Sequence, residues 1–554
     1  MMTNKALASA FDQLARLMEL HGENPFKIRS YQSAYRQLRN MPEPIADMTD
    51  EQIKALKGVG GAIAGKIREL LDGGEMKTLE RYKEKTPEGV QEMLAIKGFG
   101  PKKVRNIWKE LGIETLGELL YACNENRLVE LKGFGLKTQE QLGRQLEYAL
   151  NSRGRFHYAT AEVPADEVLS QIRALLKSGQ RAELAGAMRR GDDTVEKIEI
   201  LIGAEQLPSE LGAFVGSEAV EAADNSVAFS HSSGIPVILH TCRPEAFGSE
   251  WLTLTGSDDF LNALMGYFSE GIPEAATEEA IFHAGGIPAV PAMLRTGAEW
   301  VGKEPPRLVT ESDIRGIVHS HSTWSDGLNS LQEMAEATRD LGYEYLVITD
   351  HSQAAFYANG LKIERVKAQW EEIEALNEAL SPFHIFKGIE SDILSDGSLD
   401  YPDHILEQFD VVIASVHSNL RMDREKATER ILRAVAHPCT TILGHPTGRL
   451  LLVREGYPLD HEAVIDACAE HGVSIELNAH PWRLDLDWSW IPYALEQGVR
   501  ISINPDAHSI GGLRDVRYGV VSAQKGGLGP DKCLNALSRS EFEAHLIERR
   551  NQKG

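Results

Sequence analysis

Short apolar runs alternate with helix-like stretches in the C-terminal part of the chain. Each run is rich in Val and Ile, which is typical of buried parallel strands. The seven runs cover residues 316–318, 345–349, 385–389, 411–416, 441–444, 473–477 and 499–504. Strands that alternate with helices in this way predict a parallel sheet, and seven such strands can close into a barrel.

Polar residues suited to metal binding follow these runs. In a closed parallel barrel the carboxyl ends of the strands meet on one face, so side chains far apart in sequence converge there. The predicted ligands are His319, His321, Asp326, His351, Glu390, His417, His445, Asp506 and His508. Structural histidines at polar strand ends could account for any one of these residues, but not for nine in this order. The sequence therefore predicts a metal site at the barrel mouth.

The first two ligands form a His-x-His pair. Alternate positions of an extended chain point the same way, so we expect the imidazoles of His319 and His321 to lie side by side. Of the 18 histidines in the chain, 13 lie in residues 310–554. Mixed imidazole and carboxylate ligands suit Mn²⁺, Zn²⁺ or Fe²⁺.

Glycine pairs recur between helical stretches of the N-terminal third, at residues 56–60, 96–100 and 131–135. Glycines two residues apart permit a tight turn. They also leave backbone N–H groups at the start of the next helix open to a phosphate. One such glycine could simply end a helix, but three similar segments indicate binding to the DNA backbone. The predicted DNA contacts are Gly58, Gly60, Gly98, Gly100, Lys102, Gly133 and Gly135. Such contacts read no base sequence.

The bulk composition narrows the class of protein. At 554 residues the chain is too long for a single core. Its net charge is −24, and all of the acidic excess lies beyond residue 150, which disfavours DNA binding by charge alone. The five cysteines are dispersed and form no CxxC pair, as expected in a reducing cytosol. The sequence has no secretory segment and no apolar run long enough for a membrane. We therefore expect a soluble, monomeric, cytoplasmic protein that does not bind membranes.

Together these motifs resemble those of the bacterial family X DNA polymerases, which couple an N-terminal polymerase region to a C-terminal polymerase-and-histidinol-phosphatase (PHP) domain. The resemblance spans nearly the whole chain and includes residues 24–31, 186–191 and 254–257. It implies a multidomain α+β and α/β fold with helix-hairpin-helix domains, a polymerase-beta-like palm and a (β/α)7 PHP barrel. The expected domains are a lyase-like helix-hairpin-helix domain at 1–82, a fingers-like domain at 83–152, a degenerate palm at 153–245, a thumb remnant at 246–302 and the PHP domain at 310–554.

The palm departs from the family pattern. The family uses a Gly-Ser pair for the triphosphate and three aspartates for two magnesium ions. Here the pair is Gly186-Ala187, while Lys197 and Glu199 stand at the first two aspartate positions and Ile238 at the third. A lysine reverses the charge that a cation needs, and isoleucine supplies no ligand. We therefore expect polymerase activity to be lost.

The PHP resemblance implies two or three divalent ions. His319, His321, Glu390 and Asp506 would hold one, and Glu390 would bridge to a second with His417 and His445. Asp326, His351 and His508 would hold the third. Arg449, four residues after a ligand, is a candidate phosphate contact. Lys66 stands where the family has a lyase nucleophile that attacks an abasic sugar; a surface lysine on an amphipathic helix is the alternative.

The resulting hypothesis is metal-dependent phosphodiester hydrolysis on DNA, as a 3′–5′ exonuclease or in 3′-end or abasic-site processing during repair. Three alternatives remain open. They are a phosphomonoesterase of the histidinol-phosphatase type, a still active family X polymerase, and a non-enzymatic DNA-binding scaffold.

Overall fold

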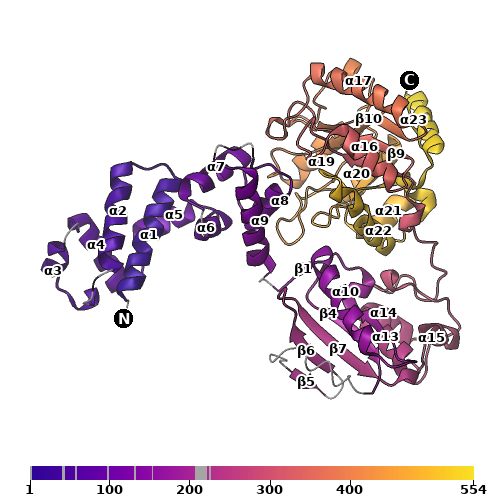
Figure 1. Cartoon of the computed structure of the whole chain (residues 1–554), viewed down its shortest axis with the longest axis horizontal. Coiled ribbons are helices and arrows are strands. Elements are labelled where there is room, and N and C mark those ends of the chain that lie inside the picture. The colour runs from indigo at the N-terminus through magenta and orange to yellow at the C-terminus, as the bar shows by residue number, and fades with distance from the viewer. Residues whose placement is uncertain are drawn as a thin grey trace. The chain divides into compact units, whose positions relative to one another are not determined.

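The computed structural model describes residues 3–553 except 40, 42–43, 57–58, 97–98, 130, 132, 152–153, 206–220 and 224–225. The chain divides into two compact units, residues 1–150 and residues 151–554. Figure 1 shows the first unit as helices and the second as two parts that each contain a sheet. None of the described helices is long and apolar enough to cross a membrane.

The first unit is helical throughout its described residues. Its helices are α1 (Asn4–Leu20), α2 (Pro25–Arg39), α3 (Asp50–Ala55), α4 (Gly61–Gly73), α5 (Lys77–Glu84), α6 (Glu88–Ala95), α7 (Pro101–Leu111), α8 (Leu116–Asn124) and α9 (Leu136–Asn151). In α1 the side chains of Leu7, Phe11, Leu14 and Met18 are fully buried, a spacing that places them on one helix face. The capping boxes at Thr49 and Thr115 explain where α3 and α8 begin. The predicted helical N-terminal region is confirmed.

The second unit begins with a mixed sheet of five strands in the order β2-β4-β7-β6-β5, which is called the palm-like sheet below. The strands are β2 (Ala182–Ala185), β4 (Ile198–Gly203), β5 (Glu221–Ala223), β6 (Ser226–Ser230) and β7 (Pro236–Cys242), beside the short pair β1 (Phe156–His157) and β3 (Thr194–Val195). Helix α10 (Tyr158–Leu175) packs its apolar residues on one face of the sheet, and α13 (Phe247–Thr255) packs Phe247 on the other. The short helix α11 (Gly186–Arg190) follows β2.

Three short helices follow the sheet and have an apolar core of their own, which includes Leu252, Phe260 and Phe282. They are α13, α14 (Asp258–Met265) and α15 (Glu278–Ala284). At the start of α15 the buried carboxylate of Glu278 accepts hydrogen bonds from both Arg189 and Arg295. This ion-pair cluster connects the helices to α11 of the palm-like sheet.

The C-terminal part is a parallel barrel of seven strands in the order β14-β13-β12-β11-β10-β9-β8. The strands are β8 (Gly316–Ser320), β9 (Tyr345–Ile348), β10 (His384–Asp392), β11 (Val411–Ser415), β12 (Ile442–Leu443), β13 (Ser474–Asn478) and β14 (Ile501–Asn504). Backbone bonds between His319, His321 and Ala507 bring the first and last strands together, so the barrel is nearly closed. All seven predicted strands are confirmed, because Val- and Ile-rich runs of this length are buried on both faces of a parallel sheet.

Helices surround the barrel, and one further helix closes the end opposite the mouth. The surrounding helices are α16 (Leu331–Asp340), α17 (Ile363–Ala379), α18 (Asp403–Leu406), α19 (Arg424–Val435), α20 (His461–Glu470), α21 (Ile491–Glu496) and α22 (Val516–Lys525). Helix α23 (Arg539–Lys553) inserts Phe542 and Leu546 among the inward-facing strand residues, with the ring of Phe542 stacked 4.7 Å from that of Tyr345. The interior is thus a packed core, and the carboxyl ends of the strands form the open mouth.

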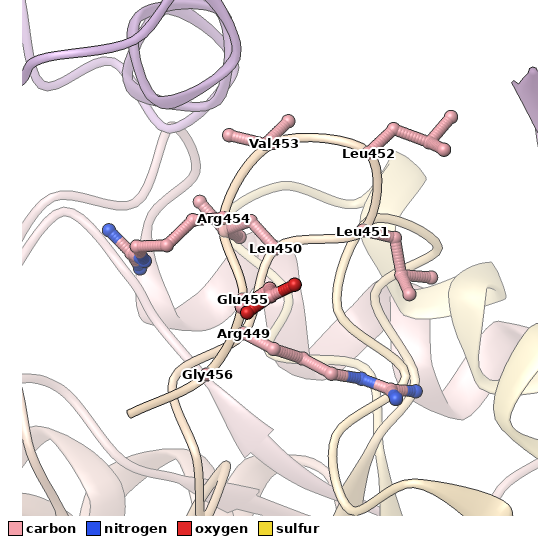
Figure 2. Close-up of a pocket in the computed structure, with 8 residues that line it drawn as sticks. All are labelled: Arg449, Leu450, Leu451, Leu452, Val453, Arg454, Glu455 and Gly456. Carbon is pink, nitrogen blue, oxygen red and sulfur yellow. The ribbon is translucent and has the colours of Figure 1, made fainter. Parts of the chain in front are cut away.

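Polar contacts join the palm-like sheet region to the barrel within the second unit. Lys525 Nζ donates to Asp192 at 2.9 Å, and Arg517 donates to Glu162 at 2.6 Å. The loop 449–456 borders a hollow of about 530 Å³, with Leu452 and Val453 at its tip and Arg449 at its base (Figure 2). The two ion pairs thus join α22 of the barrel to Asp192 and to α10.

Candidate functional site

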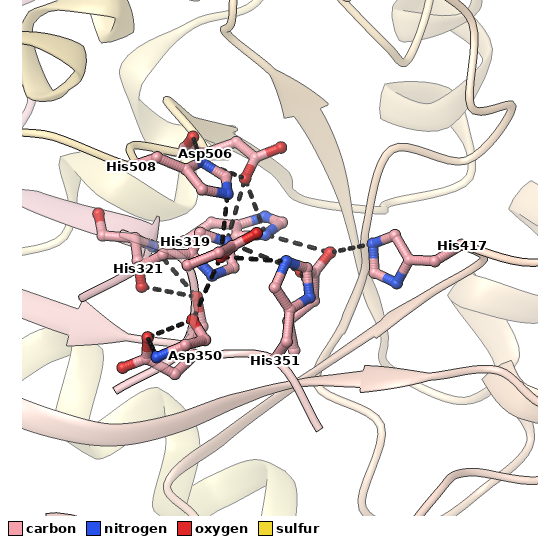
Figure 3. Close-up of polar contacts among 12 residues, drawn as sticks. His319, His321, Asp350, His351, His417, Asp506 and His508 are labelled. Atoms are coloured by element: carbon pink, nitrogen blue, oxygen red, sulfur yellow. Dashed lines mark hydrogen bonds and ion pairs between the residues drawn. The ribbon is translucent and has the colours of Figure 1, made fainter. Parts of the chain in front are cut away.

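The nine predicted ligands converge at the barrel mouth, although they span almost two hundred residues of sequence. Figure 3 shows His319, His321, His351, His417, Asp506 and His508 pointing toward one another. Three overlapping groups have donor atoms within 4.8 Å of one another. They are His321-Asp326-His351-His508, His319-His321-Asp506 and His351-Glu390-His417. Among the described residues, these are the groups whose geometry could hold a metal ion.

Strand β8 brings its two histidines to the mouth by a route that the sequence does not reveal. Val318 faces the barrel interior and Ile317 faces the helices, so regular alternation would turn His319 outward. Instead the pairing register shifts between Val318 and Ser320, and His319 has a φ of +64°. This bulge turns the His319 side chain into the mouth. The expectation of adjacent imidazoles is met, but the reason given from strand alternation is wrong.

Glu390, a member of the third group, lies among the imidazoles of three ligands. Its Oε1 is 3.2 Å from Nε2 of His319, 3.1 Å from Nε2 of His417 and 3.0 Å from Nε2 of His445. On the other side, Asp506 Oδ1 lies 3.1 Å from Nε2 of His321. A single carboxylate thus faces imidazoles from three different strand ends.

Asp326 brings together the remaining ligands. Its Oδ1 is 3.7 Å from Nε2 of His351 and 3.5 Å from Nε2 of His508. Asp350 holds the loop that carries Asp326, because its carboxylate accepts bonds from the backbone N–H groups of Ser322 and Ser325. Asp350 is fully buried, and these bonds fix the backbone of the loop on the buried side.

Further acceptors orient the rings, and two of them are acids that the sequence interpretation missed. Nδ1 of His319 donates to Glu476 at 2.5 Å, and Nδ1 of His417 donates to Asp392. Nδ1 of His508 donates to the backbone carbonyl of Asp506 at 2.9 Å. Each bond places a proton on Nδ1 and turns Nε2 toward the cluster. The charge of Glu476 between the apolar residues Ile475 and Leu477 was the available signal.

The buried imidazoles and carboxylates of this site shift one another's pKa values. Burial opposes a charge on His319, but the carboxylates of Glu476, Asp506 and Glu390 outweigh burial and raise the pKa of His319 well above its usual range. Burial likewise favours a protonated Glu390, but His417, His319 and His351 lower the pKa of Glu390 well below its usual range. The acids at the mouth therefore require nearby positive charge.

The residues present fit divalent cations. Nε2 of His319 and Oε2 of Glu390 are buried, and although charged partners lie near both atoms, neither makes a hydrogen bond of suitable geometry within the described part of the chain. Buried polar atoms without partners are costly unless another group binds them. Imidazole nitrogens and carboxylate oxygens are the donors that Mn²⁺, Zn²⁺ and Fe²⁺ accept. Cations would also supply the positive charge that the buried acids require.

Arg449 does not lie open to a phosphate. Its side chain is only 15 % exposed, and its guanidinium donates to Asp487, to Asp193 at 3.2 Å and to the carbonyl oxygen of Arg483. Nearby, the ring of His157 stacks 4.9 Å from Trp482 and its Nε2 contacts the carbonyl oxygen of Leu451. The predicted phosphate contact is thus an interface residue, because the fold brings Asp193 from the palm-like sheet beside it.

The palm positions lie together, but without a set of carboxylates. Glu199 on β4 is paired in register with Ile238 on β7. Its carboxylate lies 2.9 Å from Nζ of Lys197 and 3.4 Å from Nε2 of His240. Gly186 has a φ of +59°, and a Cβ there would lie 2.2 Å from Glu199 Oε2. Where the family pattern has three aspartates that hold two magnesium ions, this chain has Lys197, Glu199 and Ile238.

The helix-hairpin-helix glycines lie at the starts of helices. Gly60 and Gly100 precede α4 and α7, and Gly135 precedes α9. An added Cβ would meet nothing within 4 Å at these three positions. Among the glycines predicted to contact DNA that the structure describes, only Gly133 has a positive φ, +95°. Packing therefore does not demand glycine at Gly60, Gly100 or Gly135, which is consistent with close approach of a ligand to the backbone. Gly58 and Gly98 lie outside the described residues.

Two lysines of the first unit differ in their surroundings. Lys102 lies in the first turn of α7, where its backbone N–H is one of those without a partner inside the helix. Lys66 on α4 donates to Thr78 Oγ1 at 2.5 Å. Burial, together with the positive charges of Lys27 and Arg81, lowers the pKa of Lys66. A lower pKa favours the neutral amine that a Schiff-base nucleophile requires.

Comparisons with known proteins agree with this architecture. A helix-hairpin-helix domain model matches residues 2–76, a SAM-like helix-hairpin-helix tandem model matches residues 90–147, and a PHP domain model matches residues 318–480. The DNA polymerase/3′-5′ exonuclease PolX of Bacillus subtilis is 35% identical over 572 residues, which cover 98% of this chain and 99% of that protein. A probable phosphatase of Caldanaerobacter subterraneus is 28% identical over 37% of this chain and 79% of its own length. Another, of Acetivibrio thermocellus, is 31% identical over 34% of this chain and 78% of its own length.

Proposed function

The chain belongs to the bacterial family X DNA polymerases that carry a C-terminal PHP domain, and on this premise we propose that it is a metal-dependent phosphodiesterase acting on DNA. In this proposal it shortens DNA strands from the 3′ end, or processes 3′ ends and abasic sites, during repair. The same proposal divides the chain at the expected domain limits, with DNA binding in residues 1–152 and hydrolysis in residues 310–554.

The convergence of nine imidazoles and carboxylates at one barrel mouth carries this proposal. Bound divalent ions would activate water and stabilise charge on the phosphate oxygens. The chain's own contribution is orientation, because Glu476 and Asp392 set the rings of His319 and His417 with Nε2 facing inward. Glu390 lies close to the imidazoles of His319, His417 and His445 and so links ligands from three strand ends.

We further propose that template-directed synthesis is lost. Lys197 pairs with Glu199, and Ile238 lies beside that acid in the adjacent strand. Two magnesium ions would need carboxylates from both strands. In this proposal the palm-like sheet serves as a scaffold that carries Asp192 and Asp193 to the barrel surface.

The proposed nuclease is tested with the full chain and a 5′-labelled single-stranded oligodeoxynucleotide, with Mn²⁺ supplied. We expect progressively shorter labelled products, abolished by EDTA and by His319→Ala. The control is His404→Ala, which removes an exposed imidazole away from the nine ligands. Primer extension with labelled nucleotides, run beside it, should give no longer product. Intact oligonucleotide with metal-loaded wild type would refute the nuclease, and extended primer would refute the loss of synthesis.

A phosphomonoesterase is the second candidate, since curated relatives that match the PHP part of the chain are named probable phosphatases. It predicts release of inorganic phosphate from a small ester such as histidinol phosphate, with DNA left uncut. Three helix starts with open backbone N–H groups favour DNA instead, since a small ester has no use for them. Parallel assays with both substrates separate the two candidates.

A further inference from the structure

Exposed apolar side chains gather on the loops around the candidate metal centre. Among the described residues of 310–554, five large apolar side chains are exposed, and four of them follow strands that deliver ligands. The four are Leu328 (53 % exposed), Phe356 (82 %), Leu452 (41 %) and Ile510 (38 %). The fifth, Ile547, lies on α23 at the closed end. A strongly polar site is therefore bordered by an apolar rim.

Three members of this rim lie on the loops that carry Asp326 and its neighbouring ligands. Leu328 comes two residues after Asp326, Phe356 five residues after His351, and Ile510 two residues after His508. Backbone bonds connect these loops: Leu328 N–H donates to the carbonyl oxygen of His508 at 2.7 Å. The rim therefore lies on the loops that carry these three ligands.

Phe356 is held in place although its side chain is exposed. Its loop is anchored where Leu361 N–H donates to the carbonyl oxygen of His351 at 2.8 Å. Asn359 Nδ2 donates to the carbonyl oxygen of Ser325 at 3.3 Å, beside Asp326. The ring of Tyr357 lies 6.4 Å from the His351 ring and 6.1 Å from the Phe356 ring. The Tyr357 ring thus neighbours both the ring of the predicted ligand His351 and the ring of Phe356.

A nucleotide at a DNA end presents two surfaces, a charged phosphodiester and a flat base. The ligand cluster suits the first, and an exposed aromatic ring beside it suits the second, because any base can stack on an aromatic face. We propose that Phe356 is the stacking platform for the 3′-terminal nucleobase, and that Leu328 and Ile510 border it. The proposal rests on the proposed function and adds the side chain that binds the terminal base.

The test compares two single-stranded oligonucleotides that differ only at the 3′ end, one with thymidine and one with a baseless tetrahydrofuran residue. Wild type, Phe356→Ala, Phe356→Leu and Phe356→Trp are assayed as full chains with Mn²⁺. Ile547→Ala, which removes an exposed apolar side chain at the closed end, is the matched control. A 3′-terminal 2-aminopurine reports stacking by fluorescence quenching, with metal-free protein and without any turnover.

We expect Phe356→Ala and Phe356→Leu to raise KM for the thymidine end roughly 5- to 100-fold, the range for one lost base–aromatic stack. Their KM for the baseless end should match that of wild type, and Phe356→Trp should retain tight binding. The 2-aminopurine quenching should disappear in the Ala and Leu variants only.

Equal KM values for both ends in wild type, or unchanged quenching in Phe356→Ala, would overturn the platform while the nuclease stands. Cleavage of neither end by wild type would overturn the nuclease, and the quenching would still decide whether the base stacks. A shift from dimer to monomer in Phe356→Ala, with unchanged KM, would identify the rim as a contact between two copies and overturn the platform.

Discussion

Glu476 on β13 accepts a hydrogen bond from Nδ1 of His319 on β8 at 2.5 Å, and neither side chain is exposed to solvent. Glu476 also accepts from the backbone N–H of His445 and from Asn504 Nδ2. One acid therefore orients a ligand ring and supports the start of the loop that carries another ligand. It acts through His319 and His445 without being one of the nine predicted ligands.

Replacing Glu476 with Gln should weaken metal binding while the barrel stays folded. The amide keeps the shape of the side chain but loses the charge that holds the His319 ring. Loss of such a supporting group lowers metal affinity about 10- to 100-fold. Titration of Mn²⁺ into metal-free protein by calorimetry measures the change. Glu470→Gln, an exposed position at the end of α20, is the control. Equal affinities of wild type and Glu476→Gln would remove this role.

Replacing Arg449 with Met should destabilise the second unit. The guanidinium lies between Asp193, whose side chain is 13 % exposed, and the half-buried Asp487, and its loss removes an arginine partner from both acids. Removing one member of a buried ion pair costs about 3–5 kcal/mol. Urea unfolding measures the loss, and Asp193→Asn in the same background should recover part of it. A raised KM for DNA with unchanged stability would instead restore the role as a phosphate contact.

Replacing Glu278 with Gln should flatten the acid side of the stability profile. Burial alone would raise the pKa of Glu278, but bonds from Arg189 and Arg295 outweigh burial and lower it below its ordinary value. A group with a lowered folded-state pKa stabilises the protein above its unfolded-state pKa, and this contribution is lost as the pH falls through the folded-state pKa. The free energy of unfolding of wild type should therefore fall below about pH 4.5. That of Glu278→Gln should be lower at neutral pH and should fall less as the pH decreases.

Urea midpoints between pH 7 and pH 3 measure this difference. Glu279→Gln, at the exposed neighbouring position, is the matched control and should follow wild type. Parallel profiles for wild type and Glu278→Gln would show that the ion-pair cluster does not govern the acid response.

Replacing Lys66 with Ala should abolish covalent capture of abasic DNA. The amine is partly buried and its pKa is lowered, which raises the fraction of neutral amine near neutral pH. Borohydride reduction traps the Schiff base between protein and an oligonucleotide with one abasic site, and gel electrophoresis detects it. Lys54→Ala, at an exposed position on α3, should still be trapped. Trapping that persists in Lys66→Ala would assign the nucleophile to another amine.

Much of the fold could be predicted because it depends on local patterns. The apolar runs became β8 to β14, since a strand buried on both faces needs apolar residues throughout. The convergence of the nine side chains followed from the topology of a parallel barrel. The bulge at His319 could not be predicted, because it depends on how β8 pairs with β9.

The roles of Arg449 and Glu476 depend on partners distant in sequence. Arg449 follows a ligand closely, but its partner Asp193 lies more than 250 residues earlier in the chain, just before β3. Glu476 looks like an acid inside a strand until the barrel closes and brings His319 to it. Long-range contacts of this kind leave no periodic signal in the sequence.

The sequence by itself determined which elements form and which residue types stand at the strand ends, because hydrophobic periodicity and residue chemistry are local properties. Only the tertiary structure decided which nitrogen of each imidazole faces the cluster, which arginine is engaged at an interface, and which apolar side chains remain exposed at the mouth. These outcomes depend on distances between atoms that only the closed barrel brings together.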